Sequence, residues 1–175
     1  MIYEPREDSY LLAGEVEKRA RGRVLDMGTG SGFQALAAEK SNSVTSVTAA
    51  DIDPEVVRFV SSMRINAVQS DLFENIDGEY DFIIFNPPYL PTDPRDRVPA
   101  IDGGPTGREV LDKFLDECPA YLTEGGGALF VQSSITGIKK TEKRLEELGF
   151  EYEIIARQKI PWEELVVFSC QLKKS

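Results

Sequence analysis

The strongest constraint on the fold of this chain is the run of residues 81–85, in which four apolar residues follow Asp81 and lead directly into the sequence Asn-Pro-Pro-Tyr. A run of this kind is typical of a short strand buried on both faces, and such strands occur in parallel sheets covered by helices. Pro87 ends the strand abruptly, because proline restricts the preceding residue to extended conformations and cannot donate a hydrogen bond to a neighbouring strand. We therefore expect Asn86 at the carboxyl end of a central strand, where open α/β sheets bind ligands.

The residue types at this strand end suit a planar NH2 group, as in a carboxamide or an adenine. The nitrogen of such a group is a poor nucleophile because its lone pair is delocalised. The side-chain oxygen of Asn86 and the carbonyl of Pro87 can accept its two N–H groups and stabilise the positive charge that develops during attack on an electrophile. Pro88 keeps the turn rigid, and Tyr89 is expected to hold the flat group by stacking. The structural alternative is a rigid turn that only leads the chain out of the strand.

A glycine-rich turn predicts a second part of the site. Residues 24–27 form an apolar strand interrupted by Asp26, and Gly28, Gly30 and Gly32 follow before a helical segment. Glycines let the backbone turn tightly and approach a ligand closely. The G-x-G-x-G spacing differs from the dinucleotide fingerprint, and an acid before the first glycine suits an amine-bearing ligand better than a pyrophosphate. S-adenosylmethionine, which carries an ammonium and a sulfonium, is therefore favoured over a nicotinamide cofactor.

Two further carboxylates follow predicted strands. Asp51 lies nearly twenty residues beyond the glycine turn, the separation at which a carboxylate reaches the ribose hydroxyls of a nucleotide. Asp71 and Leu72 follow a short strand, where Asp71 can accept an adenine amino group and Leu72 presents its backbone N–H. The alternative for Asp71 is a loop residue that caps a turn.

The order of the segments predicts a Rossmann-like, doubly wound α/β fold. We expect helices over about residues 7–20, 33–38, 54–66, 108–122 and 139–148, with Asp53 and Pro54 starting the third, and strands over residues 24–27, 44–51, 67–70, 81–85, 128–133, 150–160 and 165–172. Residues 90–106 are expected to form a long loop, and residues 125–127 a glycine turn. These elements imply a seven-stranded, mostly parallel sheet with a C-terminal antiparallel hairpin and helices on both faces. All candidate groups then lie along one rim of the sheet, which is formed by the carboxyl ends of its parallel strands.

Composition excludes several functional classes. We expect residues 1–175 to form a single domain, in the cytoplasm, because no apolar stretch suggests a membrane span and the start shows no secretory signal. The absence of histidine rules out a Ser-His-Asp triad, and the two distant cysteines indicate neither a disulfide framework nor a zinc site, so no metal is expected. A net charge of −10 disfavours unaided binding to nucleic acid.

Together these residues resemble the class I S-adenosylmethionine-dependent methyltransferases. The Asn-Pro-Pro-Tyr sequence is similar to the motif of the amino-methylating branch, which includes DNA adenine enzymes and HemK-like release-factor glutamine methyltransferases. Residues 4–9, 102–104 and 107–110 resemble the short archaeal and eukaryotic HemK-like group, with Ser9 where many relatives have threonine. The resemblance covers nearly the whole chain. We expect no counterpart of the N-terminal helical substrate domain found in bacterial HemK proteins.

The resemblance implies methylation of the glutamine side-chain amide in the Gly-Gly-Gln motif of a class I peptide chain release factor. It also implies a heterodimer with a small zinc-binding activator protein, which covers apolar surface. Asn86, Pro87 and Tyr89 would act on the substrate amide, and the helix of residues 7–20 would cover the cofactor. The implied contacts to S-adenosylmethionine are Ser9, Asp26, Gly28, Gly30, Gly32, Asp51, Asp71, Leu72 and Asn86.

Other functions stay open from the residues alone. The same pocket would accept adenine N6 or guanine N2 in nucleic acid, which the net charge and the lack of a target-recognition domain disfavour. Methylation of protein lysine is disfavoured, because a motif that binds a planar amide has no purpose there. A non-catalytic S-adenosylmethionine-binding protein has no use for Asn86 and Tyr89, and the glycine spacing and Asp26 disfavour a nicotinamide oxidoreductase.

Overall fold

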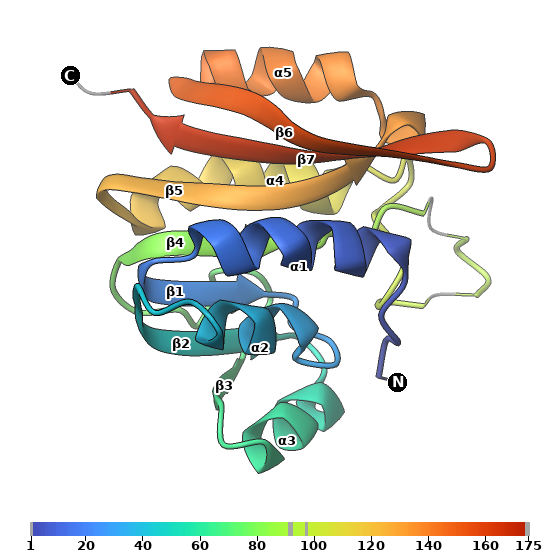
Figure 1. Ribbon diagram of the computed structural model, residues 1–175. Helices are drawn as coiled ribbons and strands as arrows, with labels where there is room; N and C mark the ends of the chain where they lie inside the picture. Colours follow the sequence, from blue (N-terminus) through green and yellow to red (C-terminus); the bar gives the residue numbers. More distant parts are fainter. Residues whose placement is uncertain (1, 91–92, 97, 174–175) are drawn as a thin grey trace.

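A computed structural model describes residues 2–90, 93–96 and 98–173, arranged around a seven-stranded sheet with the order β3-β2-β1-β4-β5-β7-β6 (Figure 1). The strands are β1 (Gly22–Met27), β2 (Val44–Asp51), β3 (Asn66–Gln69), β4 (Tyr80–Phe85), β5 (Leu122–Ser133), β6 (Phe150–Ile160) and β7 (Glu163–Leu172). Strands β1 to β5 are parallel, and β7 runs antiparallel to both β5 and β6. The predicted mostly parallel sheet with a C-terminal antiparallel hairpin is confirmed.

Helices cover both faces of this sheet (Figure 1). They are α1 (Glu7–Arg19), α2 (Phe33–Glu39), α3 (Pro54–Ser62), α4 (Glu109–Glu117) and α5 (Ile138–Glu147), with the short 3-10 helices η1 (Cys118–Tyr121) and η2 (Ser134–Thr136). Leu12 of α1 shares an apolar cluster with Val24 of β1. The next strand residue, Leu25, belongs to a second cluster with Phe114 of α4. Side chains of β1 thus alternate between two covered faces, as its apolar sequence requires.

Helix α3 is shorter than the sequence predicts. Asp53 caps it as expected, because its carboxylate accepts the backbone N–H of Glu55 at 2.8 Å. The predicted end at about residue 66 is wrong, since the helix stops at Ser62. Arg64 has a left-handed φ of 64°, which turns the chain into β3 at Asn66.

Two predictions around β5 are also wrong. Helix α4 ends at Glu117 rather than at residue 122, because Pro119 has no backbone N–H to continue it, and the chain goes on as η1. Residues 125–127, predicted as a turn, lie within β5, where Gly127 pairs with Phe82 of β4 and with Gln171 of β7. A β-carbon on Gly127 would lie 2.8 Å from the Cys170 carbonyl oxygen, so the glycine permits a close approach of two strands.

The predicted long loop after β4 folds back on the end of that strand. The N–H of Leu90 donates to the carbonyl of Ile101 at 2.9 Å, and the N–H of Gly103 donates to the carbonyl of Leu90 at 2.7 Å. Residues 91, 92 and 97 of this loop lie outside the described part of the chain. The loop is therefore anchored directly beside the Asn-Pro-Pro-Tyr sequence.

The described residues carry no helix that is both long and apolar enough to cross a membrane. Nor, in the same part of the chain, do three or more His, Cys, Asp or Glu side chains gather in an arrangement that could hold a metal ion. Cys118 and Cys170 are both buried with free thiols, and burial raises the pKa of Cys170 to about 12.

Candidate active site

The carboxyl ends of β1 to β4 bring the predicted site residues to one edge of the sheet. Asp26 lies one residue before the end of β1, Asp51 ends β2, and Asn86 follows β4 directly. Because these strands are parallel neighbours, their ends meet at the same rim. The N-terminal segment, the loop after β4 and the tip of the β6–β7 hairpin reach the same side of the molecule (Figure 1).

Asp51 joins the glycine turn to the end of β2. The three glycines of the turn have left-handed φ angles between 56° and 81°. Asp51 Oδ2 accepts the N–H of Gly30 at 3.0 Å, and Oδ1 accepts the N–H of Asp53 at 3.0 Å. Burial raises the pKa of this half-buried carboxyl, while its backbone hydrogen bonds lower it. Two adjacent strand ends are thus held in one rigid unit.

Asp26 is buried beneath the same turn, with 1% of its surface exposed. Its Oδ2 accepts the hydroxyl of Thr29 at 2.7 Å and the N–H of Ala35, in the first turn of α2, at 3.1 Å. Burial raises the pKa of Asp26 to about 7, against the lowering effect of these two hydrogen bonds. The carboxyl group therefore fixes the turn to α2.

Ser9 lies beside the turn, and its hydroxyl has a role within α1. Ser9 Oγ accepts the N–H of Arg6 at 3.3 Å in a capping arrangement. Its carbonyl accepts the side-chain amide of Gln34 at 2.9 Å, which ties α1 to α2. Gln34 is buried, and its Oε1 has no hydrogen-bond partner among the described residues. Gln34 was not predicted as a site residue, and its one signal in the sequence is its place in the first helical turn after the glycines.

Asp71 and Leu72 differ in their surroundings. Asp71 is exposed and lines a shallow depression with Phe73 and Lys113, on the side of the sheet that α4 covers. Leu72 is nearly buried, with a left-handed φ of 48°, and its carbonyl accepts the hydroxyl of Ser70 at 2.6 Å. Ser70 thus holds the turn that presents Leu72 at the rim.

The loop after β4 packs against the Asn-Pro-Pro-Tyr sequence. Pro87 is buried, whereas Asn86, Pro88 and Tyr89 are half-buried. A β-carbon on Gly103 would lie 2.5 Å from the carbonyl oxygen of Pro88, so only glycine allows this approach. Residues 102–104 are one of the stretches that resemble the HemK-like group, and the close approach to Pro88 is the physical reason for glycine at position 103.

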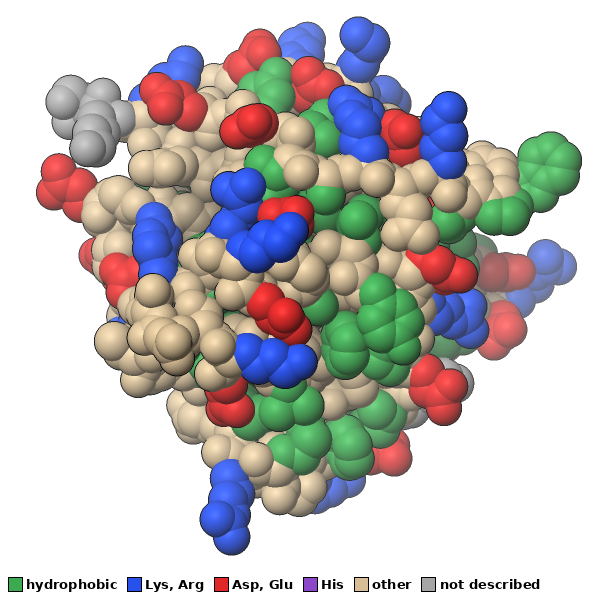
Figure 2. Space-filling view, viewed as in Figure 1, with side chains coloured by type: hydrophobic (Ala, Val, Ile, Leu, Met, Phe, Trp, Pro, Cys, Tyr) green, Lys and Arg blue, Asp and Glu red, His purple; other side chains and the backbone are tan. Residues whose placement is uncertain are grey.

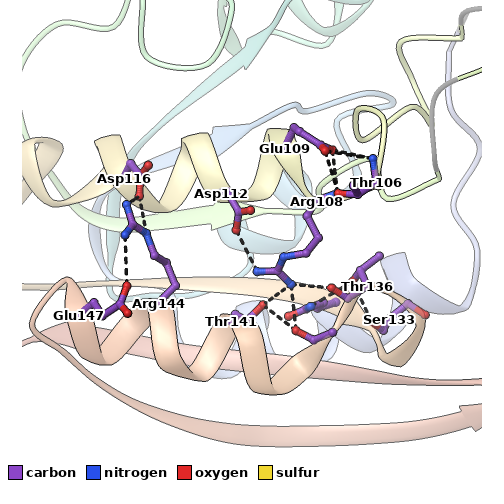
Figure 3. A network of polar contacts seen from close by, with 12 residues as sticks. Thr106, Arg108, Glu109, Asp112, Asp116, Ser133, Thr136, Thr141, Arg144 and Glu147 are labelled. Atoms are coloured by element: carbon purple, nitrogen blue, oxygen red, sulfur yellow. Dashed lines mark hydrogen bonds and ion pairs between the residues drawn. The ribbon is translucent and has the colours of Figure 1, made fainter. Parts of the chain in front are cut away.

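Arg108 anchors the far end of that loop (Figure 3). Its guanidinium is buried and donates from Nη1 to the carbonyls of Thr136 and Gly137 at 2.6 and 2.9 Å and to Thr141 Oγ1 at 3.0 Å. Nη2 pairs with Asp112 Oδ1 at 2.9 Å. One side chain therefore joins the loop after β4 to the connection between β5 and α5.

Acidic and tyrosine side chains that were not predicted from the sequence lie near Tyr89. Burial, and then the nearby Glu163 and Asp8 carboxylates, raise the pKa of Tyr89 to about 12. Asp8 is 7% exposed and accepts the hydroxyl of Tyr3 at 3.3 Å. Burial and Asp8 raise the pKa of Tyr3 as well. Glu163 comes from the start of β7, and no local pattern links it to Tyr89.

Charged side chains of both signs interleave over the face that carries α1 and α2, rather than gathering by sign (Figure 2). Proteins that bind nucleic acid through its phosphates usually present a basic patch or stripe. On this face, interleaved charge together with a net charge of −10 gives a backbone phosphate little to bind.

Comparison with known proteins gives the family. The family model described as the Methyltransferase small domain matches residues 6–160. The chain belongs to this family. A Methanocaldococcus jannaschii protein named as a protein N5-glutamine methyltransferase is 41% identical to this methyltransferase, over 96% of the chain and 90% of that protein. The solved structure of the E. cuniculi Mtq2–Trm112 complex, described as responsible for methylation of the eRF1 translation termination factor, is similar with a TM-score of 0.80 and 33% identity, over 98% of this chain and 99% of that one.

A bacterial relative is longer than this methyltransferase. The release factor glutamine methyltransferase of Rhodopirellula baltica is 35% identical over 74% of this chain, which corresponds to 51% of that protein. The chain therefore spans about half the length of this relative.

Members of this family use S-adenosylmethionine, and so does this enzyme. The residues at the rim fit that cofactor. The glycine turn brings exposed backbone to the strand end, and the half-buried Asp51 offers carboxylate oxygens for ribose hydroxyls. The buried oxygen of Gln34 and the carboxyl of Asp26 supply acceptors beside the same turn for an ammonium group.

Proposed function

We propose that this methyltransferase transfers a methyl group from S-adenosylmethionine to the side-chain amide nitrogen of the glutamine in a Gly-Gly-Gln motif of a class I peptide chain release factor. The observation that carries the proposal is the rigid end of β4. There Asn86 and the Pro87 carbonyl follow a strand whose last four residues are buried, and Gly103 packs against the carbonyl of Pro88. The names of the relatives at 41% and 35% identity support the same substrate class.

In this proposal the chain's own residues act by binding and orienting the amide. Asn86 Oδ1 and the Pro87 carbonyl each accept one N–H, which fixes the nitrogen and stabilises positive charge as it forms. Tyr89 stacks on the flat group, and its hydroxyl stays protonated because its pKa is raised to about 12. The proton that the amide nitrogen loses passes to water after methylation. S-adenosylmethionine supplies the electrophilic methyl group.

The cofactor contacts belong to the same proposal. Asp51 accepts the ribose hydroxyls, the glycine turn and Asp26 border the methionine moiety, and Asp71 and the Leu72 N–H bind the adenine. Ser9 and Asn86 complete the set. The support is the common rim on which the glycine turn, Asp51 and Asn86 lie, at the ends of neighbouring parallel strands.

We also propose that the enzyme works in the cytoplasm with a small zinc-binding activator subunit. The support is the similarity to a chain solved in complex with Trm112, across nearly the full length of both chains. Methylation of amino groups in nucleic acid is not favoured, because the acidic net charge repels phosphate.

The deciding experiment measures methyl transfer from labelled S-adenosylmethionine to a release factor that carries Gly-Gly-Gln. The control substrate is the same factor with that glutamine changed to asparagine, and both are tested with and without the activator subunit. Label on the first factor alone is the expected result. Equal label on both factors places the methyl elsewhere on the protein. No label, with cofactor bound normally, contradicts the proposed substrate.

A further inference from the structure

The tip of the β6–β7 hairpin exposes a tryptophan in a strained backbone conformation. Ile160 pairs with Glu163, so Pro161 and Trp162 form the two-residue turn between the strands. Trp162 has a left-handed φ of 70° and is 98% exposed. Proline followed by a residue with positive φ is the pattern of a type II turn, whose second position favours glycine or asparagine. A bulky side chain costs stability there, and the indole of Trp162 buries almost no surface that would offset the cost.

The strand register carries this tip past the rim that holds Asn86. Phe85, the residue before Asn86, pairs with Phe130 of β5, and Phe130 pairs with Phe168 of β7. The hairpin continues from there to Trp162, and its tip reaches beyond the end of β5 (Figure 1). At ~3.3 Å per residue along a strand and ~4.8 Å between strands, Trp162 lies on the order of 20 Å from Asn86.

Two further apolar side chains are exposed on the same side of the sheet. Leu90 follows the Asn-Pro-Pro-Tyr sequence, and Ile135 lies in η2, directly after β5. The N–H of Glu164 donates to Ser134 Oγ at 2.9 Å, which joins η2 to the hairpin close to its tip. Exposed apolar side chains that gather around a site indicate a surface that binds a macromolecule.

We infer that Trp162 is a specificity-determining residue that contacts the body of the release factor, outside the Gly-Gly-Gln motif. This inference rests on the proposed function. When the target glutamine is held at Asn86, its two neighbouring glycines fall far short of Trp162, because an extended chain advances at most ~3.6 Å per residue. A more distant part of the substrate therefore reaches the hairpin tip. Tryptophan is enriched among the residues that dominate protein–protein binding, since it buries a large and rigid apolar surface.

The substrate is the occupant that the position of the tip favours. Any protein that delivers a glutamine to Asn86 approaches the carboxyl ends of the parallel strands, and the hairpin projects past those ends (Figure 1). The two-residue turn holds the indole outward before the substrate arrives. Trp162 therefore loses little conformational freedom when the release factor binds.

The test compares Trp162→Gly with Leu36→Ala, using an intact release factor as substrate and the activator subunit present. Glycine suits the positive φ of the turn and removes the indole. We expect KM for the release factor to rise at least about tenfold, as for other residues that dominate an interface, with kcat within about twofold of wild type. The dissociation constant for the factor whose target glutamine is changed to asparagine should rise equally. Leu36 is exposed on α2, a helix away from the hairpin, and its variant should match wild type (Figure 1).

Thermal unfolding and two further variants separate this role from a structural one. The Tm of Trp162→Gly should be no lower than that of wild type, because glycine adopts positive φ without strain. Trp162→Asn, which also tolerates positive φ, should raise KM to the same extent. Trp162→Phe keeps an aromatic side chain and should keep KM within about threefold of wild type. A lowered Tm together with weaker binding of S-adenosylmethionine would instead make Trp162 a structural residue.

Two measurements detect other occupants of the tip. Affinity for the activator subunit, measured by calorimetry, and the sedimentation of the free enzyme should be the same in Trp162→Gly and wild type. Weaker activator binding would assign the tip to the activator, and loss of a dimer would assign it to a second copy of the chain. Either result overturns the inference.

The inference and the proposed function fail in different ways. A wild-type enzyme that methylates the release factor while Trp162→Gly keeps a normal KM refutes the inference alone. A wild-type enzyme that leaves the release factor unmethylated removes the proposed function, and the inference with it.

Discussion

Gly103 packs so closely against Pro88 that a β-carbon on the glycine would lie 2.5 Å from the proline carbonyl oxygen. The atom it would meet belongs to the backbone and cannot rotate away. The same β-carbon would also lie 2.5 Å from the carbonyl oxygen of Gly107. The loop after β4 and the substrate end of β4 therefore form one packed unit.

Replacing Gly103 with alanine should displace this unit. We expect the free energy of unfolding to fall by about 1–3 kcal/mol, the usual cost of overpacking, and methyl transfer to fall more than tenfold with nearly unchanged cofactor affinity. Gly14→Ala is the control, because a β-carbon there meets nothing within 4 Å and alanine favours the helix by ~0.5–1 kcal/mol. Urea unfolding and initial rates test both variants. Normal transfer in Gly103→Ala would show that the packing does not position Pro88.

Asn86→Ala should abolish methyl transfer. The variant removes one acceptor for the amide N–H and its stabilisation of developing charge, while the strand and the glycine turn remain. Loss of one such group typically costs a factor of 10²–10³ in kcat. Single-turnover rates measure the loss of methyl transfer, and calorimetric titration measures how much cofactor binding the variant keeps. If the variant also fails to fold, Asn86 has a structural role.

Asp51→Ala should weaken binding of S-adenosylmethionine. The carboxylate lies at the end of β2 and would bind the ribose hydroxyls, so its loss should cost ~1–3 kcal/mol of binding free energy. Part of the loss should come from the Gly30 N–H, which Asp51 accepts at 3.0 Å. The control is Asp77→Ala, an exposed position away from the rim. Equal affinity in the two variants would remove Asp51 from the cofactor site.

Arg108→Met should destabilise the fold. The substitution leaves the carbonyls of Thr136 and Gly137 without their charged donor, which we expect to lower the free energy of unfolding by about 2–4 kcal/mol. The matched control is Arg144→Met, whose guanidinium pairs with Asp116 on the surface and should contribute little. Chemical unfolding gives the free energy of unfolding of both variants for this comparison. A loss no larger than in Arg144→Met contradicts the anchoring role (Figure 3).

The stability of the ligand-free protein should fall as pH rises from about 5 to about 8. The pKa of Asp26 is about 7 in the folded state against 3.8 ordinarily, so the folded state binds this proton more tightly than the unfolded state. That contribution is complete below the ordinary pKa and is lost as pH rises through the folded pKa. Asp51, whose pKa is also raised by burial, acts in the same direction.

Asp26→Asn is the test of this assignment. Asparagine keeps an acceptor for Thr29 and Ala35 but cannot ionise, so urea unfolding of the variant should depend less on pH between about 5 and about 8. Carboxyl groups whose pKa is lowered, such as Asp81, are ionised in both states over this interval and do not contribute. If the pH dependence of unfolding is unchanged in Asp26→Asn, groups other than Asp26 cause it.

The sequence predicted the rim because its signals are local. The apolar run before Asn86, the glycine turn after Asp26 and the Asp53–Pro54 cap each act over a few residues, and parallel strands carry their ends to one edge. The errors arose where a single residue changed the outcome. Arg64 ended α3 early, Pro119 ended α4, and the glycines of β5 fitted between two strands instead of turning.

The sequence by itself therefore determined the order of the elements, the parallel sheet and the residues at four strand ends, since hydrophobic period, proline and glycine limit the backbone locally. Only the tertiary structure decided that Glu163 and Asp8 lie beside Tyr89, that Gly103 supports Pro88 and that Arg108 joins the loop to η2 and α5. These contacts connect residues far apart in the chain. Their partners depend on the packing of whole elements, which no local pattern records.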